Sequence, residues 1–287
     1  MKKSKHISQS ELESYLWGAA TLLRGYIDAG DYKQFIFPLL FYKRLCDVYD
    51  EEMADALEES GGEQEYAALP EQHCFQIPED AHWKATRTKV KNVGKAIQDA
   101  LRAIETANPD TLYGVFGDAQ WTNKDRLSDA LIKDLIEHFS RLSFGNRDVR
   151  SDLIGDAYEY LMQMYASTAG KSGGEFYTPQ EVSELLARIT VVGKSEVNKV
   201  YDPACGSGSL LLKFAKVLGP DKVRQGFFGQ EINLTTYNLC RINMFLHDVN
   251  FEKFDIAHGD TLTDPAHWDD EPFEAIVSNP PYSIKWD

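Results

Sequence analysis

Two hydrophobic patterns divide the chain into a helical part and a part that alternates strands with helices. Over the first half, apolar residues recur at three- and four-residue spacing, which is the period of an amphipathic helix. In the second half, short apolar runs alternate with helical patterns, which is typical of a doubly wound α/β domain. We therefore predict an all-helical domain over residues 1–150 and an α/β domain over residues 151–287.

The helical part begins with a capping-box pattern. Ser8 and Glu11 stand at the spacing in which each side chain bonds the backbone of the other, ahead of the first amphipathic helix. A longer helix is predicted to begin near Asp31 and to dissolve in the acidic stretch 51–65. Residues 70–83 show no period and are expected to be irregular, and further helices are predicted over 90–104, 128–142 and 148–165.

The α/β part opens after a stretch of small residues. Thr178 is predicted to cap a helix that has Pro179 in its first turn and continues to Ile189. Beyond it, the pattern predicts helices over 209–218 and 234–246 and strands over 199–201, 226–230, 254–257 and 274–278.

The last predicted strand runs directly into Asn279-Pro280-Pro281-Tyr282. Two successive prolines have no amide donor, so the chain must leave the sheet here with its carbonyls free to face a ligand. The side-chain oxygen of Asn279 and the carbonyl of Pro280 are acceptors, and Tyr282 offers a flat surface. We predict that these three groups hold an adenine base.

The first predicted strand ends in the turn Asp202-Pro203-Ala204-Cys205-Gly206-Ser207-Gly208, which opens a helix. Glycines at such a turn let the backbone approach a ligand, and the helix start offers free N–H groups, so a nucleotide-like cofactor fits. A dinucleotide fingerprint needs a third glycine where this chain has Leu211, so that pattern is only half matched. A tight turn without a ligand stays open as the alternative.

Two acids follow the next predicted strands. Glu231 ends the second strand beside the glycine turn, where an acid of this fold accepts hydrogen bonds from ribose hydroxyls. Asp260 follows the third strand and could accept from an exocyclic amino group, although a turn-forming role explains it equally well. We expect both carboxylates at the edge of the sheet where ligands bind.

Composition limits the class of protein. The 287 residues are 43% hydrophobic and no apolar run approaches a membrane span, so we expect a soluble, cytoplasmic protein. The four cysteines are scattered without a C-x-x-C pair, and we predict neither disulfides nor a metal site. The net charge of −15 is unfavourable for gripping DNA, so a nucleic-acid substrate would be held mainly by another chain.

These motifs resemble a known family. The turn that begins at Asp202 and the tetrapeptide that begins at Asn279 look like the cofactor and catalytic motifs of S-adenosylmethionine-dependent amino methyltransferases. The upstream Gly173-Gly174-Glu175-Phe176-Tyr177-Thr178-Pro179 narrows the resemblance to the modification (M) subunit of type I restriction-modification systems, which are DNA adenine-N6 methyltransferases. The long helical region resembles the amino-terminal domain of that subunit, so the resemblance covers nearly the whole chain.

The resemblance implies a Rossmann-like methyltransferase sheet, with S-adenosyl-L-methionine as cofactor. It places a specificity (S) subunit, a second M subunit, a restriction (R) subunit and double-stranded DNA among the partners, and no membrane. The cofactor-binding residues that it implies are Phe176, Thr178, Pro179, Asp202, Ala204, Gly206, Gly208, Glu231 and Asp260. The residues implied at the target base are Asn279, Pro280 and Tyr282.

The implied chemistry agrees with these residue types. The exocyclic amine of adenine is a poor nucleophile because its lone pair is delocalised into the ring, and two acceptors, Asn279 Oδ1 and the Pro280 carbonyl, would aim that lone pair at the methyl group. The base must first be flipped out of the duplex, and Tyr282 would stack on it. No metal is required.

Two other functions remain compatible with the sequence. Protein-glutamine N5 methyltransferases share the tetrapeptide and also have a helical amino-terminal region. Alternatively, the chain is a non-catalytic interaction fragment, because it ends at Asp287, shortly after the catalytic turn. From that position we expect a sheet that is truncated at its carboxyl-terminal side, with an exposed edge at 275–277 and weak activity of the chain alone.

Overall fold

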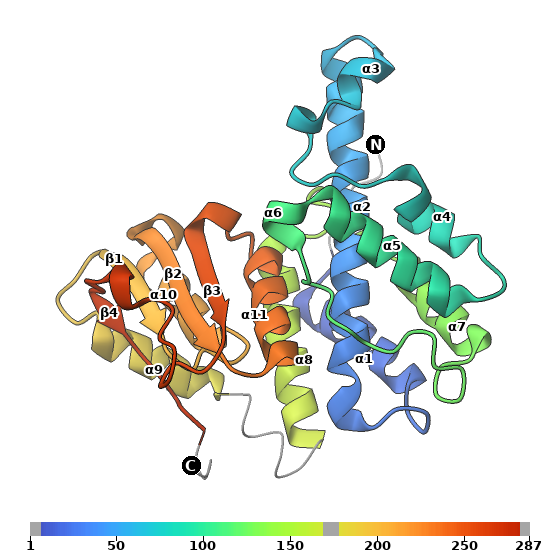
Figure 1. The fold of residues 1–287 in the computed structure, drawn as a ribbon. Helices are drawn as coiled ribbons and strands as arrows, with labels where there is room; N and C mark the ends of the chain where they lie inside the picture. Colours follow the sequence, from blue (N-terminus) through green and yellow to red (C-terminus); the bar gives the residue numbers. More distant parts are fainter. Residues whose placement is uncertain (1–6, 169–177, 282–287) are drawn as a thin grey trace. The chain divides into compact units, whose positions relative to one another are not determined.

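The computed structural model describes residues 7–168 and 178–281. The predicted site residues Phe176 and Tyr282 lie outside the described residues. The chain divides into two compact units, Met1–Ala157 and Tyr158–Asp287 (Figure 1). Among the described helices, none has both the length and the apolar character that crossing a membrane requires.

The first unit is built of helices, as the sequence predicts. The capping box is confirmed, since the Ser8 amide donates to the Glu11 carboxylate at 2.9 Å and the Ser8 hydroxyl accepts from the Glu11 amide at 3.4 Å. The helices of this unit are α1 (Gln9–Leu22), α2 (Lys33–Glu59), α3 (Gln64–Ala67), α4 (Trp83–Arg87), α5 (Val93–Ala107), α6 (Pro109–Leu112), α7 (Asp129–Phe139) and the start of α8 (Ser151–Thr168).

One polar stripe of α2 binds the loop of residues 144–147. The stripe repeats at three- and four-residue spacing and consists of Arg44, Asp47, Glu51 and Asp55. The Asp47 carboxylate accepts from the amide of Phe144 at 2.7 Å, and the Glu51 carboxylate accepts from the amide of Asn146 at 2.7 Å. Gly145 lies directly on the stripe, because a Cβ built there would lie 2.1 Å from the Glu51 Oε1.

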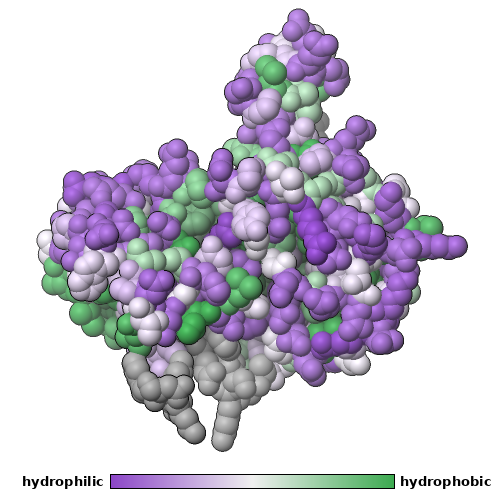
Figure 2. All heavy atoms as spheres, viewed as in Figure 1, coloured by the Kyte–Doolittle hydropathy of each residue, from purple (hydrophilic) through white to green (hydrophobic). Residues whose placement is uncertain are grey.

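This stripe refines the predicted end of the long helix. We expected α2 to dissolve within the acidic stretch 51–65, around Gly61-Gly62, and it ends at Glu59, so the residues before that end are helical and not a loop or a frayed end. The acids that looked like a loop in sequence are helical because two of them, Glu51 and Asp55, find partners on the 144–147 loop. The remaining surface of this end is polar, and Figure 2 shows mostly hydrophilic side chains over the end of α2 and over α3.

The second unit is the predicted doubly wound α/β fold. Four parallel strands stand in the order β3-β2-β1-β4, the order of a Rossmann-type half-sheet. The strands are β1 (Val197–Asp202), β2 (Val223–Glu231), β3 (Phe254–His258) and β4 (Ala275–Ile276). The helices are α9 (Gln180–Thr190), α10 (Ser209–Leu218) and α11 (Leu234–Leu246), with the bounds of α10 and α11 as predicted. Helix α9 begins one residue later than expected, because Pro179 itself occupies the N-cap position.

The two faces of the sheet are covered differently. Helix α10 packs on β1 and β2, α11 packs on β2 and β3, and α9 packs on α10 (Figure 1). The core between them is formed by aliphatic and aromatic residues such as Val200, Phe214 and Phe227. On the opposite face, the segment after β3 supplies Phe273, whose ring stacks on Tyr201 at 4.8 Å between centroids.

Parallel pairing brings the ends of three strands to one edge. Asp202 is the last residue of β1, Glu231 is the last residue of β2, and Asn279 follows β4 by three residues. The amide of Val277 still donates to the Tyr201 carbonyl at 3.0 Å, so the chain leaves the sheet directly before Asn279. The fold therefore places the predicted site residues of three separate sequence regions at the same edge.

We predict that Gly226 in β2 is required for stability. Its φ is +101°, and a Cβ at this position would lie 2.1 Å from the carbonyl oxygen of Lys253. Gly226→Ala should lower the free energy of unfolding by about 2–4 kcal/mol, because the backbone must leave a conformation that only glycine adopts readily. Urea unfolding measures the change. The exposed neighbour Gln225 provides the control, since Gln225→Ala should change stability by no more than about 0.5 kcal/mol.

Candidate functional site

A cleft of about 230 Å³ opens at the carboxyl edge of the sheet. Four parts of the chain meet there: Thr178 before α9, the turn after β1, the residues that end and follow β2, and the segment that leaves β4. Strand order reverses between β1 and β4, and open α/β sheets bind their ligands at such a crevice. The cleft is therefore the candidate site of this unit.

The glycine turn (residues 202–209) forms one wall of the cleft. Gly206 and Gly208 have φ values of 56° and 81°, which residues with a side chain rarely adopt. A Cβ at Gly208 would also lie 2.7 Å from the Sγ of Cys240 on α11. The two glycines thus let the turn fold tightly against α11, with its backbone directed at the cleft.

Two carboxylates in the cleft are held by backbone amides. Asp202 accepts from the amide of Ala204 at 3.0 Å. The two oxygens of Glu231 accept from different amides, Oε2 from Gly206 at 3.1 Å and Oε1 from Asn233 at 2.7 Å. A carboxylate has four lone pairs in all, so Glu231 keeps acceptor capacity for a ligand beyond these amide bonds. The turn and the strand end therefore fix the orientation of both acids.

Burial makes both carboxylates harder to ionise. Asp202 is 1% exposed, and burial raises the pKa of its carboxyl to about 7, although the hydrogen bond from Ala204 opposes the shift. Burial also raises the pKa of Glu231, against the hydrogen bonds from Asn233 and Gly206. The protein thus keeps two acids in a place where their negative charge is poorly solvated.

No basic side chain offsets this charge within the cleft. Among the described residues that line it, two are acidic and none is Lys, Arg or His. Such a lining repels phosphate groups and attracts a cation. A pyrophosphate would meet two carboxylates here, which agrees with a dinucleotide fingerprint that is only half matched.

A direct hydrogen bond joins two predicted motifs across the mouth of the cleft. The Asn279 Nδ2 donates to the Thr178 hydroxyl at 3.1 Å, although the two residues are 101 positions apart. In this orientation the Oδ1 of Asn279 is left as an acceptor. Asn279 is exposed, so a molecule that approaches from solvent can reach it.

The structure brings together half of the residues predicted from sequence. Those that line the cleft are Thr178, Asp202, Ala204, Gly206, Glu231 and Asn279. Pro179, Gly208 and Pro280 stand beside lining residues without lining the cleft themselves. Sequence reasoning missed Cys205, Ser207, Ser209, Leu210, Ile232, Asn233 and Pro281. Most of these are direct neighbours of predicted residues, so their position in the same turns was the signal that could have found them.

Asp260 does not line the cleft. It is half-buried, and its carboxylate accepts from the amide of Leu262 at 2.9 Å. This is the turn-forming arrangement that the sequence left open as an alternative. A contact between Asp260 and a cofactor stays a prediction.

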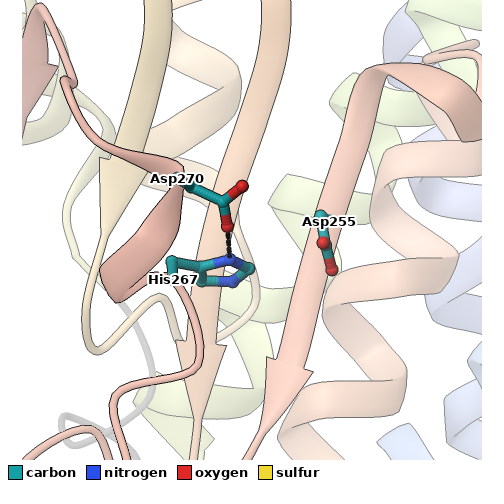
Figure 3. A group of neighbouring side chains, drawn as sticks. All are labelled: Asp255, His267 and Asp270. Atoms are coloured by element: carbon teal, nitrogen blue, oxygen red, sulfur yellow. Dashed lines mark hydrogen bonds and ion pairs between the residues drawn. The ribbon is translucent and has the colours of Figure 1, made fainter.

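A separate group of potential metal ligands lies on the face of the sheet that carries Phe228. The group consists of Asp255, His267 and Asp270, whose ligand atoms lie within 4.8 Å of one another (Figure 3). However, Nδ1 of His267 lies 2.9 Å from the Asp270 carboxylate, and Nε2 lies 2.9 Å from the Gly229 carbonyl. Both ring nitrogens are engaged, so neither offers a free lone pair to a metal. His267 instead fastens the segment after β3 to β2.

Two family models match successive parts of the chain. Residues 12–139 match the HsdM N-terminal domain, and residues 149–287 match the N-6 DNA Methylase family. Among solved structures, the methyltransferase subunit of a type I restriction-modification system from Streptococcus thermophilus is similar, with a TM-score of 0.81 and 29% identity over 98% of this chain and 65% of that one.

Curated relatives carry the same description. The methylase subunit of the type I restriction enzyme MpnII from Mycoplasma pneumoniae is 36% identical over 100% of this chain and 60% of its own length. The MjaVIII methylase subunit from Methanocaldococcus jannaschii is 30% identical over 98% of this chain and 50% of its own length. The chain thus spans between half and two thirds of these relatives. From the two matched domains and these relatives, the chain belongs to the family of methylase (M) subunits of type I restriction-modification systems.

Proposed function

We propose that this chain carries the methyl-transfer site of a type I modification subunit, which transfers a methyl group from S-adenosyl-L-methionine to the N6 amino group of an adenine in double-stranded DNA. The observation that carries this proposal is the acidic cleft at the carboxyl edge of the sheet, which is lined by two carboxylates and no basic residue among the described ones. S-adenosyl-L-methionine bears a net positive charge, whereas nucleotide cofactors with phosphates are anionic. The lining favours the former.

The residues of the cleft fit the parts of that cofactor. The Glu231 carboxylate, oriented by backbone amides, keeps acceptor capacity for the ribose hydroxyls. Asp202 and the backbone of Ala204 and Gly206 stand at the turn that would receive its amino-acid part, as the family resemblance implies. When bound, the cofactor supplies a methyl group activated on a sulfonium.

Asn279 is positioned to hold the target amine. With its Nδ2 on the Thr178 hydroxyl, its Oδ1 can accept one hydrogen of an exocyclic amine, and the Pro280 carbonyl can accept the other. Two acceptors draw the nitrogen towards tetrahedral geometry and aim its lone pair at the methyl group, which lowers the barrier by orientation. The stacking of Tyr282 on the base and the contact of Phe176 with the cofactor belong to the proposal as well.

The substrate class is drawn from the family. The cleft and the tetrapeptide suit a glutamine amide as well as an adenine amine, since both are planar conjugated nitrogens. Relatives named as methylase subunits of type I restriction enzymes support DNA. We assign partner and DNA contacts to the helical residues 1–150 and methyl transfer to residues 151–287. We also propose that the protein acts in the cytoplasm, on the DNA that is its proposed substrate.

Assembly follows from the same comparison and from charge. With a net charge of −15, the chain has little electrostatic attraction for DNA of its own. We therefore propose that a specificity subunit reads and holds the target, together with a second modification subunit. A restriction subunit would join the same complex.

The buried charge of Asp202 links stability to the cationic ligand. Its pKa in the folded chain is about 7, above the ordinary 3.8, so the folded state binds more protons than the unfolded state between these values. Stability from this group is therefore highest at low pH and falls as pH rises towards 7, by up to about 1.4 kcal/mol per pH unit. A cation bound beside the ionised Asp202 carboxylate offsets this loss of stability.

We predict that Asp202→Asn stabilises the ligand-free protein and weakens cofactor binding. Asparagine keeps the acceptor for the Ala204 amide but removes the charge. Between about pH 5 and pH 8, the melting temperature of the wild type should fall more than that of the variant, since only the wild type ionises Asp202. Scanning calorimetry measures this difference, and titration calorimetry should show weaker cofactor binding by the variant at the higher pH. Parallel pH profiles of the two proteins would contradict the prediction.

We predict that Asn279→Ala removes methyl transfer but not cofactor binding. Loss of one of two acceptors at the reacting amine should lower kcat by about a hundredfold or more, because the lone pair is no longer aimed. The measurement is transfer of labelled methyl groups to DNA by the complete complex with its specificity subunit. The exposed Asn250 lies in the segment before β3 and does not line the cleft, so it provides a matched Asn→Ala control. A fully active Asn279→Ala enzyme would refute the proposed mechanism.

We predict that Glu231→Ala weakens cofactor binding. Removing the carboxylate takes away both ribose acceptors, so the Kd for S-adenosyl-L-methionine should rise by about tenfold or more. Titration calorimetry checks this on the chain itself. If the wild-type chain fails to bind the cofactor while still binding a specificity subunit, the non-catalytic alternative replaces the proposal.

A further inference from the structure

We infer that Glu159 is a positioning residue that joins the two walls of the cleft through a buried hydrogen-bond network. The residue lies on α8 and does not line the cleft, so it acts through other residues rather than by touching a ligand. This role rests on the proposed function, because the alignment of the walls matters only when the cleft binds its cofactor.

Both oxygens of Glu159 are held by amide side chains. Oε1 accepts from the Nδ2 of Asn243 on α11, and Oε2 accepts from the Nε2 of Gln180 on α9, each at 2.8 Å. Glu159 is 6% exposed, and among the described residues no Lys, Arg or His forms an ion pair with it. The carboxylate therefore connects three helices at their buried sides.

The first arm of the network, the hydrogen bond from Asn243, reaches the glycine turn. The same Asn243 Nδ2 that donates to Glu159 also donates to the carbonyl of Ser207 at 2.9 Å. Ser207 lines the cleft and is 3% exposed. Glu159 thus holds the Asn243 amide in the one orientation that supports the turn.

The second arm of the network, the hydrogen bond from Gln180, reaches the opposite wall of the cleft, which contains Thr178 and Asn279. Gln180 is the first residue of α9, two positions after Thr178, whose hydroxyl accepts from Asn279. The position of Thr178, and with it the orientation of the Asn279 amide, depends on where α9 begins. Through Gln180, Glu159 links the wall that would orient the target amine to the wall that would hold the cofactor.

The network leaves one buried polar atom without a partner in the described part of the chain, which indicates that packing alone does not account for it. Because the Asn243 Nδ2 must face two acceptors, its Oδ1 is buried without a donor among the described residues. A carboxylate buried without a cation is also unfavourable. Apolar residues at these two positions would avoid both costs, but they could not hold a backbone carbonyl and a helix start at fixed places.

The test compares Glu159→Ala with Glu159→Gln in the full chain. Glutamine can keep the geometry without the charge: its oxygen accepts from Asn243, and its NH2 donates to Gln180 once the Gln180 amide has turned over. We expect Glu159→Ala to raise the Kd for S-adenosyl-L-methionine by about tenfold and Glu159→Gln to change it by less than about twofold. Gln180→Ala, which cuts one arm at a half-buried position, should give an intermediate loss and guards against misfolding of Glu159→Ala.

A second measurement needs no cofactor. Hydrogen exchange of the glycine turn should be faster in Glu159→Ala than in the wild type, and unchanged in Glu159→Gln and in the control Glu184→Ala, an exposed acid on α9. Equal weakening by Glu159→Ala and Glu159→Gln would show that charge and not position matters, and would overturn the inference. Unchanged exchange and binding in Glu159→Ala would overturn it as well. Faster exchange in Glu159→Ala, in a protein that binds no S-adenosyl-L-methionine, would support the role of Glu159 in holding the turn and would contradict the proposed cofactor.

Discussion

Backbone amides of one turn hold the carboxylates at the ends of two neighbouring parallel strands, and the shape of the cleft depends on this contact. The Ala204 amide binds Asp202 and the Gly206 amide binds Glu231, so the turn after β1 is bonded to its own strand and to the next one. These contacts tie the turn to β2. The negative charge of both side chains therefore stays at a fixed place on the sheet edge, next to the residues that follow β4.

A site of this charge has consequences for a DNA-modifying enzyme. The cleft would repel the phosphates of the substrate that it is proposed to modify, while a neutral base carries no such penalty. Extrusion of the base from the duplex separates the two, because the base can enter while its backbone remains outside. Under the proposed function, the acidic cleft selects for a neutral base, and the attraction of the DNA backbone falls to the proposed partner chains.

The sequence predicted best those features that depend on local pattern. The bounds of α10 and α11 and the position of Glu231 follow from apolar period and from strand ends, and the structure has them at the predicted places. It predicted least well what depends on distant partners. The acidic run from Glu51 looked like a loop because its acceptors bind amides about a hundred positions away. Glu159 gave no pattern at all, since its partners on α9 and α11 come from other parts of the chain.

The contact between Gly145 and Glu51 limits which substitutions the two positions can accept. Any side chain at position 145 would displace the Glu51 carboxylate that binds the next two amides of the loop, and a residue without an acceptor at position 51 would leave those amides without this partner. The two positions are therefore coupled. Across homologous chains, we therefore expect the two positions to be retained together or replaced together, although they lie 94 positions apart in the sequence.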